Sequence, residues 1–275
     1  MATLKRLVPL RLTRLAKPYG GCRMLFGAVL WPRTFNEKIQ RMKLFNRDPR
    51  LPQRENKILV KEFVKDKLGS EWVTPTLWQG ESLPPIEQRA WPIPFVIKAN
   101  NGCGWNVFVR QESDLDWPRI DNLAAEWRSA PFGADLGEWL YSEIKPALLV
   151  EPFIGDRSNL PTDYKLWTFN GEVKVIEVIT DREHDHKGTM FDADWCRLPF
   201  KGDYPTDPRP IPRPASLDRM IKAAKVLAED FPFVRVDFYE IGDQPKFGEM
   251  SFYPSSGLES FYPPEWDAKL GQLWR

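Results

Sequence analysis

The chain has few of the residues that build disulfide frameworks or zinc sites. It contains three cysteines, Cys22, Cys103 and Cys196, and two histidines in 275 residues. No two cysteines stand at the C-x-x-C spacing of a metal site. An odd number of widely separated cysteines also argues against a secreted disulfide scaffold. We therefore expect a reducing, cytoplasmic compartment.

Long apolar runs and an excess of charge of one sign are also missing. No stretch reaches the roughly 20 apolar residues that a membrane-spanning helix needs. The net charge is +1, which gives no indication of a nucleic-acid-binding protein. There is no Walker A loop and no dinucleotide fingerprint, because the glycine-rich stretch at 102–104 is followed by a strand pattern and not by a helix.

The amino-terminal segment, MATLKRLVPLRLTRLAKPYGGCR at positions 1–23, carries only basic charges. Basic residues interrupt its apolar stretches, which argues against a signal peptide. Two interpretations stay open. The segment could lie on an anionic membrane surface as a basic amphipathic element, or it could pack on the body as an irregular arm in which Pro9 ends any first helix. We assign residues 1–54 to a basic arm with short helical pieces.

The rest of the chain alternates helical and strand-like patterns, which predicts an α+β fold with antiparallel strand pairs. Apolar residues at helical spacing predict helices within 54–69, 114–144 and 215–230. Strands are predicted at 72–77, 95–98, 105–110 and 147–154. Hairpins are predicted at 163–183, with Asn170-Gly171 at the turn, and at 233–254. The aromatic-rich tail after residue 251 could stack on a sugar or fill the core, and we favour the core.

The stretch FVIKANNGCGWNVFV, at 95–109, places Lys98 at the end of an apolar strand and a glycine-rich turn directly after it. Successive backbone N–H groups in such a turn can bind a phosphate, and a lysine adds a positive charge. The pattern predicts a strand–turn–strand flap whose lysine faces the ligand that the flap covers. The alternative is an ordinary hairpin with a solvent-facing lysine.

Acidic residues face each other in the last predicted hairpin. Side chains alternate along a strand, so a turn near residue 243 would place Asp237 opposite Glu249 and Arg235 opposite Ser251. Facing carboxylates repel each other. A Mg²⁺ ion bound by both carboxylates and by substrate phosphates would remove the repulsion. Alternatively both acids face water, or Arg235 pairs with one of them.

Two further patterns are weaker. In LLVEPFIGD, a buried strand ends at Glu151 and could present backbone groups to a purine and Asp156 to a ribose, although from the spacing alone we favour a plain core strand with an exposed end. In REHDHKG, His184 and His186 stand two positions apart. On a strand, this spacing would place both imidazoles on one face, where they could bind a metal ion. No third and fourth ligand stand nearby, and we favour a polar loop.

Taken in order, Asn56-Lys57, FVIKANNGCG, VEPFIGD, DYKLWTFNGEV and VRVDFYE with FGEMSFYP resemble the ATP-grasp enzymes. The DYK-x-x-x-FNGEVK block, DADW and GEMSFYPSSGL resemble its TupA-like branch, found among proteins of cell-surface polysaccharide and teichuronopeptide biosynthesis. The resemblance covers roughly residues 33–272. It implies two α+β subdomains that clasp ATP between antiparallel sheets. Residues 55–147 would form the lid with the flap, and 148–275 the subdomain with the hinge and metal site.

The resemblance also implies roles for individual residues. The ATP-binding set would be Lys57, Lys98, Asn100, Gly102 and Gly104 at the phosphates, Glu151 and Phe153 at the adenine, and Asp156 at the ribose. The Mg²⁺ set would be Asp237, Glu249 and Ser251, where the family pattern has asparagine in place of this serine. The catalytic set would be Lys165, Arg182 and Arg235, near the transferred phosphate or the acyl substrate.

The implied activity is that of an ATP-dependent carboxylate–amine ligase acting through an acyl phosphate. The substrates would be a small carboxylate and an amine, such as a uronic acid or saccharide and an amino acid. Two alternatives stay open: a glycosyltransferase of polysaccharide biosynthesis, and a nucleotide-binding protein that has lost catalysis. Only about fifty residues precede Lys57, so the acceptor site would come from the arm, the aromatic tail or a partner.

Overall fold

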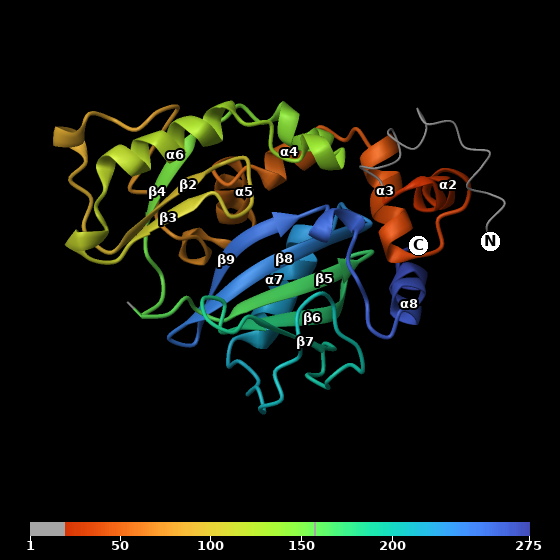
Figure 1. The fold of residues 1–275 in the computed structure, drawn as a ribbon. Helices are drawn as coiled ribbons and strands as arrows, with labels where there is room; N and C mark the ends of the chain where they lie inside the picture. The colour runs from red at the N-terminus through yellow and green to blue at the C-terminus, as the bar shows by residue number, and fades with distance from the viewer. Residues whose placement is uncertain (1–19, 157) are drawn as a thin grey trace.

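The computed structural model describes residues 20–156 and 158–275, and it builds three helices where the sequence predicts an arm (Figure 1). These are α2 (Cys22–Leu30), α3 (Phe35–Phe45) and α4 (Arg50–Glu55). Thr34 and Glu37 cap the start of α3 reciprocally, as a capping box does. Phe35 is fully buried and its ring lies 5.0 Å from that of Phe233. Residues 35–45 therefore belong to the folded body.

The interpretations of the first nineteen residues, including membrane contact, lie outside the described residues. Within the described ranges, no helix is long and apolar enough to cross a membrane.

Helix α5 (Leu59–Leu68) confirms the helix predicted within 54–69. The side-chain oxygen of Asn56 accepts hydrogen bonds from the backbone N–H groups of Ile58 and Leu59, and Gly69 ends the helix at φ 107°. The strand predicted at 72–77 is wrong, because the strand β1 spans Trp78–Gly80. Pro75 has no N–H to donate to a strand ladder, which keeps this segment irregular.

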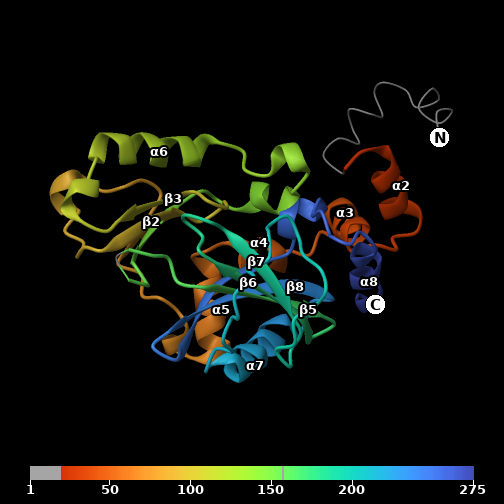
Figure 2. The ribbon, with the colours of Figure 1, turned by 60° about the horizontal axis from the view of Figure 1, so that its bottom comes forward.

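The first sheet has four antiparallel strands in the order β1-β4-β2-β3. Its other strands are β2 (Phe95–Ala99), β3 (Asn106–Val109) and β4 (Leu148–Pro152). Helix α6 (Trp117–Ser129) buries its apolar side chains in the same core as this sheet, and Figure 2 shows it lying over the strands. The predicted flap is thus the connection between β2 and β3.

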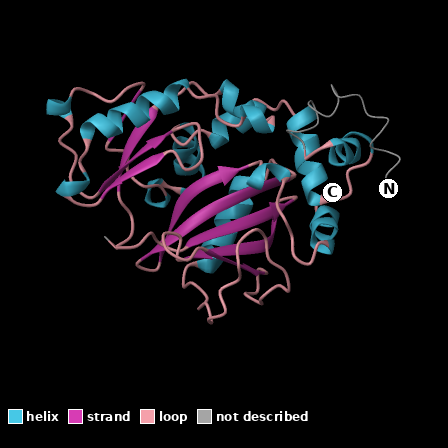
Figure 3. Cartoon of the chain, in the orientation of Figure 1, coloured by secondary structure: helices cyan, strands magenta, loops and turns pink. Residues whose placement is uncertain are grey.

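The second sheet has five antiparallel strands in the order β7-β6-β5-β8-β9, separate from the first in Figure 3. The strands are β5 (Asp163–Phe169), β6 (Glu172–Thr180), β7 (Lys187–Phe191), β8 (Phe233–Ile241) and β9 (Gln244–Ser251). Asn170 and Gly171 turn at positive φ between β5 and β6, as predicted. Helix α7 (Leu217–Ala228) buries its apolar side in the larger core, which the sheet shares with α3, α4 and α5.

The remaining elements are short. Helix α8 (Glu265–Leu273) packs beside α3. The 3-10 turns span Ser70–Trp72, Ile86–Gln88, Glu112–Asp114, Ala134–Leu136, Trp139–Glu143 and Pro254–Gly257. In the tail, Phe252, Tyr253 and Phe261 are buried in the larger core and Trp266 packs against it, which confirms the core interpretation for these residues, whereas it is wrong for Tyr262, which is exposed.

The sheets do not divide the chain at residue 148. Strand β4 begins at residue 148 and pairs with β2 in the first sheet. Helix α5 precedes the first sheet in the chain, but it packs in the larger core, with the second sheet. The division into a lid of residues 55–147 and a second subdomain of residues 148–275 stays a prediction.

Candidate active site

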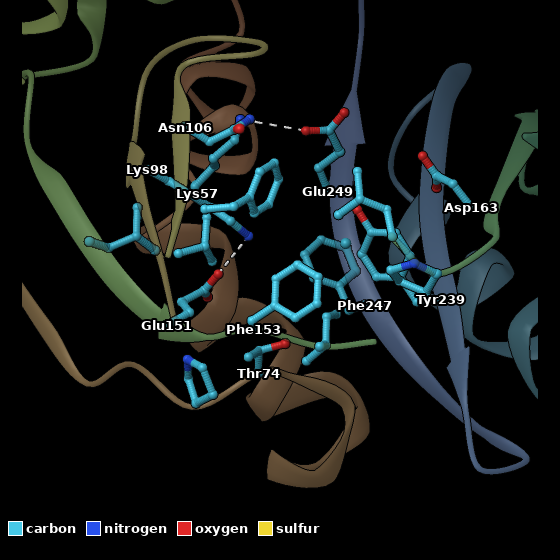
Figure 4. A pocket seen from close by; sticks show the side chains of 18 of the residues that line it. Lys57, Thr74, Lys98, Asn106, Glu151, Phe153, Asp163, Tyr239, Phe247 and Glu249 are labelled. Carbon is cyan, nitrogen blue, oxygen red and sulfur yellow. Dashed lines mark hydrogen bonds and ion pairs between the residues drawn. The ribbon is translucent and has the colours of Figure 1, made fainter. Parts of the chain in front are cut away.

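The two sheets contribute to one cavity of about 210 Å³. The first sheet brings Lys98 from β2 and Glu151 from β4, and the second brings Tyr239 from β8 and Glu249 from β9. Figure 4 shows the two groups on opposite sides, with Phe153 and Phe247 between them. The cavity therefore has a polar end and an apolar part.

Glu151 is shared by two lysines. Its Oε2 accepts a hydrogen bond from Lys98 Nζ at 2.7 Å, and its Oε1 from Lys61 Nζ at 2.5 Å. The side chains of Lys61 and Glu151 are each 8% exposed, whereas that of Lys98 is 31% exposed. Burial would raise the pKa of Glu151, but the two ammonium groups hold it below its usual value. Its carboxylate is thus committed to lysines, and only its backbone is left for a hinge role.

Lys57 connects the flap to the second sheet. Its Nζ donates to the carbonyl oxygen of Gly102 at 2.8 Å and lies 3.5 Å from Glu249 Oε2. Burial would lower the pKa of Lys57, but the Glu249 carboxylate and the nearby Cys103 raise it. Lys57 is therefore a cation held at the polar end of the cavity.

The flap residues have different roles. Gly102 and Gly104 line the cavity, and a Cβ on Gly102 would lie 2.7 Å from the Trp105 ring. Asn100 is buried, and it lies outside the cavity lining. Its Nδ2 donates to the Lys145 carbonyl at 3.0 Å and its Oδ1 accepts from the Ala147 N–H at 2.8 Å. Asn100 therefore anchors the start of the flap and has little left to offer a phosphate.

Of the two side chains predicted at the adenine and the ribose, Phe153 lies at the cavity and Asp156 does not. Phe153 lines the cavity, and the Arg110 guanidinium lies 4.9 Å from its ring centre. Asp156 does not line it. Its Oδ1 accepts from the backbone N–H groups of Ser158 and Asn159, each at 2.7 Å, in a local turn. The position of Asp156 therefore does not support the predicted ribose contact.

Asp237 lies opposite Glu249, and Arg235 opposite Ser251, as the sequence predicts. The alternative in which Arg235 pairs with an acid is what the structure shows. Arg235 holds Asp237 with Nε and Nη2, at 2.8 and 2.7 Å, and Lys165 Nζ donates to the same carboxylate at 2.6 Å. The guanidinium of Arg235 and the ammonium of Lys165 therefore offset the repulsion between the two carboxylates.

The residues fit a Mg²⁺ ion in part. Glu249 lines the cavity, and its nearest cations are Arg235 at 3.4 Å and Lys57 at 3.5 Å. Burial would raise the pKa of Glu249, but Lys57, Lys165 and Arg235 lower it to about 2. An ionised, loosely held carboxylate is a suitable ligand for an ion that also binds substrate phosphates.

The other two predicted ligands fit less well. Both oxygens of Asp237 already accept from cations, and the Ser251 hydroxyl lies 3.2 Å from Arg235 Nη2. Among the residues that the structure describes, no three acidic, histidine or cysteine side chains are arranged to hold a metal ion. Glu249 is therefore the ligand that the arrangement supports, and Asp237 would join it only after releasing Arg235 or Lys165.

Lys61, Asp163 and Tyr239 are among the cavity residues that the sequence reasoning missed. Asp163 Oδ2 pairs with Lys165 at 2.8 Å and Arg182 at 3.3 Å, while its buried Oδ1 has no hydrogen-bond partner among the residues that the structure describes. Burial would lower the pKa of Arg182, but Asp163 and Tyr239 raise it. Two signals were available: Lys61 stands four residues after Lys57, and Asp163 shares a strand face with Lys165.

A buried acid lies behind the polar end. Glu55 accepts from the Phe252 N–H at 2.7 Å and from the Tyr141 hydroxyl at 3.2 Å. Burial raises the pKa of Glu55 to about 8, against the lowering effect of the Phe252 N–H, and Glu249 adds to the rise. Glu55 therefore carries a proton at neutral pH.

Comparison with known proteins gives a family match over most of the chain. A family model described as TupA-like ATPgrasp matches residues 37–275. The structure is similar to D-alanine–D-alanine ligase from Helicobacter pylori, with 16% identity and a TM-score of 0.46, over 80% of this chain and 56% of that one. It is also similar to D-alanine–D-alanine ligase from Bacillus anthracis, with 17% identity and a TM-score of 0.47, over 80% of this chain and 63% of that one. The chain thus spans less than two thirds of either ligase. No curated protein matches it.

Proposed function

The chain belongs to the TupA-like ATP-grasp family, and from that premise we propose that it is an ATP-dependent ligase that joins a carboxylate to an amine through an acyl phosphate. We assign the acid to the uronic acids or acidic saccharides and the amine to the amino acids, within cell-surface polysaccharide or peptide-conjugate biosynthesis. One observation carries the activity. Lys57 and Lys98 face Glu249 in a single cavity to which both sheets contribute (Figure 4), and Arg182 also lines this cavity.

The apolar part of the cavity suits an adenine. Phe153 and Phe247 line it, next to the backbone of residues 152–154. Aromatic and aliphatic walls with a few backbone polar groups are typical of nucleotide sites. Asp163, rather than Asp156, is the acid that would accept a hydrogen bond from a hydroxyl of the nucleotide, because its Oδ1 is buried at the cavity and no described residue donates a hydrogen bond to it.

The polar end suits the phosphates. Lys98 is the more exposed of the two lysines on Glu151, and Lys57 lies under the flap. The backbone N–H groups of the flap add donors. Glu249 would hold Mg²⁺, which when bound would neutralise charge on the phosphates and orient the terminal one for attack.

The reaction needs positioning and charge neutralisation more than covalent help from the protein. A carboxylate oxygen of the acid attacks the γ-phosphorus, and the bond to the ADP oxygen breaks. Arg182, whose side chain is 32% exposed, is placed to neutralise the transferred group, while Lys165 and Arg235 hold Asp237 in position. The amine then attacks the acyl carbon, phosphate leaves with the bonding electrons, and the amine loses a proton.

The glycosyltransferase alternative would draw on an aspartate pair that binds a metal and a sugar diphosphate. The D-x-D spacing does occur, at Asp114 with Asp116 and at Asp192 with Asp194. Asp114, Asp116 and Asp192 accept hydrogen bonds from nearby backbone N–H groups, as residues that cap turns and helices do. None of the four lines the cavity.

The test is ADP release from Mg-ATP in the presence of glucuronate or galacturonate and a set of amino acids. The proposal expects release that requires both an acid and an amine, and that falls by at least about tenfold in Lys98→Met because a charge-assisted phosphate contact is lost. Lys67→Met is the matched control, because Lys67 is an exposed lysine on α5. Release that is equal in Lys98→Met and the control would contradict the assignment.

A further inference from the structure

A second cavity, of about 460 Å³, lies on the other side of the flap. Its lining comes from the end of α3, the end of α6 and residues 130–146. Asn101 lines this cavity, whereas the next two residues, Gly102 and Cys103, line the first. Consecutive residues of one turn therefore face the two cavities.

Aromatic contacts connect the two cavities. The ring of Trp105, at the first, lies 5.0 Å from that of Phe132, at the second. The ring of Phe132 lies 4.8 Å from that of Tyr141, whose hydroxyl donates to Glu55. A molecule bound in the second cavity would thus be separated from the phosphate end of the first by little more than the flap turn.

The charge of the second cavity favours an anion. Its ionisable lining groups are Lys43, Arg47, Arg128 and Glu138. Lys43 Nζ is used internally, donating to the carbonyls of Leu136 and Ser256. Both arginines are exposed.

The two guanidinium groups have donors to spare. Arg47 Nη1 donates to two backbone carbonyls, and Arg128 Nη1 donates to the Glu81 carbonyl. The other nitrogens of Arg47 and Arg128 make no hydrogen bond to any described residue, so each could bind a carboxylate.

Two buried polar atoms at the second cavity, Asn101 Oδ1 and Trp139 Nε1, lack a hydrogen-bond partner among the described residues. Asn101 is 4% exposed, and its Oδ1 accepts no hydrogen bond from the described residues. Buried polar groups are nearly always hydrogen-bonded, and an unpaired one costs stability. A ligand hydroxyl would pair it. Trp139 and Tyr141 add aromatic faces of the kind on which sugar rings pack.

We infer that the second cavity binds the acidic substrate of the proposed ligase, as an acidic saccharide with more than one carboxylate. Its rings lie against Trp139 and Tyr141, a hydroxyl meets Asn101, and one carboxylate meets Arg47 and Arg128. The carboxylate that reacts then points past the flap turn toward the first cavity. The assignment rests on the proposed function for the reaction, but binding in this cavity can be measured without it.

The probe is trigalacturonate, with maltotriose as its neutral counterpart, in calorimetry with the full chain. The inference expects saturable binding of trigalacturonate and none of maltotriose. Arg128→Glu should weaken binding by about five- to tenfold, as reversal of a rim charge does. Arg119→Glu is the matched control, because Arg119 is an exposed arginine on the same helix outside the cavity. Its affinity should be that of the unmodified chain.

A second variant separates binding from folding. Asn101→Ala should also weaken trigalacturonate binding but leave the urea midpoint of unfolding unchanged or higher, because it removes an unpaired buried group. Failure of trigalacturonate to bind, or equal loss in Arg119→Glu, would overturn the inference. Binding of triglutamate in its place would overturn the saccharide assignment. Mg-ATP affinity, measured on the same samples, tests the proposed function separately and should be the same in Arg128→Glu.

Discussion

Replacing Glu151 by glutamine tests whether the two lysines that share its carboxylate do different things. The Lys61–Glu151 pair is nearly sealed from solvent, with both side chains 8% exposed. Removing one partner of a buried ion pair costs about 3–5 kcal/mol, and glutamine keeps one acceptor oxygen, so we expect a loss of about 2–4 kcal/mol in the free energy of unfolding. In a chain of this size that lowers the melting temperature by about 4–16 °C.

The two lysine variants should then diverge. Lys61→Met leaves the buried Glu151 carboxylate with one partner fewer. We expect it to lower the free energy of unfolding by about 2–3 kcal/mol and to leave the affinity for nucleotide unchanged. Lys98 is 31% exposed and its pairing is screened, so Lys98→Met should cost about 1 kcal/mol or less and act mainly on ATP affinity.

The assay is urea unfolding followed by tryptophan fluorescence and by circular dichroism, with Mg-ATP titrations on the same proteins. Glu126→Gln, at an exposed position on α6, controls for loss of a negative charge. A cost below 1 kcal/mol for Glu151→Gln would refute the burial argument. Equal destabilisation by Lys98→Met and Lys61→Met would refute the division of roles between the lysines.

Three other predictions follow from the same structure. The pKa of Glu55 is raised to about 8, so its contribution to stability is complete below the unfolded pKa near 4.5 and is lost as pH rises through about 8. Urea unfolding at pH 5.5 and 8.5 compares the unmodified chain with Glu55→Gln, and the free energy of unfolding of the unmodified chain should fall relative to that of the variant at the higher pH. A difference between the two proteins that does not change with pH would contradict this prediction. Asn100→Ala removes two buried hydrogen bonds and should lower the free energy of unfolding by about 2–3 kcal/mol; an unchanged urea midpoint would show that Asn100 does not anchor the flap. A Cβ on Gly102 would meet the Trp105 ring, and Gly104 has φ 72°, which strains any residue with a Cβ, so calorimetry should show weaker Mg-ATP binding for both Gly102→Ala and Gly104→Ala; affinity equal to that of the unmodified chain in both variants would be inconsistent with the flap geometry.

The last hairpin shows what the sequence alone can establish. A two-residue period and an assumed turn centred on residue 243 predicted Asp237 opposite Glu249. The turn pairs Ile241 with Gln244, and the pairing of Asp237 with Glu249 holds because a bulge at Gly248 adds one residue to β9. The glycine-rich turn after Lys98 and the Asn170-Gly171 turn were predictable for the same reason, since each depends on a few neighbouring residues.

Contacts between distant segments could not be read in this way. Lys61 and Glu151 are ninety positions apart, and they meet only because α5, which packs in the larger core, brings the Lys61 side chain to β4. Asp163 and Asp156 are both acids near the hinge, but the course of the intervening loop decides that Asp163 lines the cavity and Asp156 closes a local turn. Alternation along a strand predicts on which face a side chain lies. It does not predict which cations will pair with a carboxylate such as that of Asp237.

The central claim is that the cavity between the two sheets binds Mg-ATP through Glu249. Its most direct test is calorimetry of Mg-ATP, and of UDP-glucose as the competing donor, against the unmodified chain and Glu249→Gln. The account predicts binding of Mg-ATP that depends on Mg²⁺ and weakens at least about tenfold in Glu249→Gln, with no binding of UDP-glucose. Equal Mg-ATP affinity in the two proteins, or preferential binding of UDP-glucose, would contradict it.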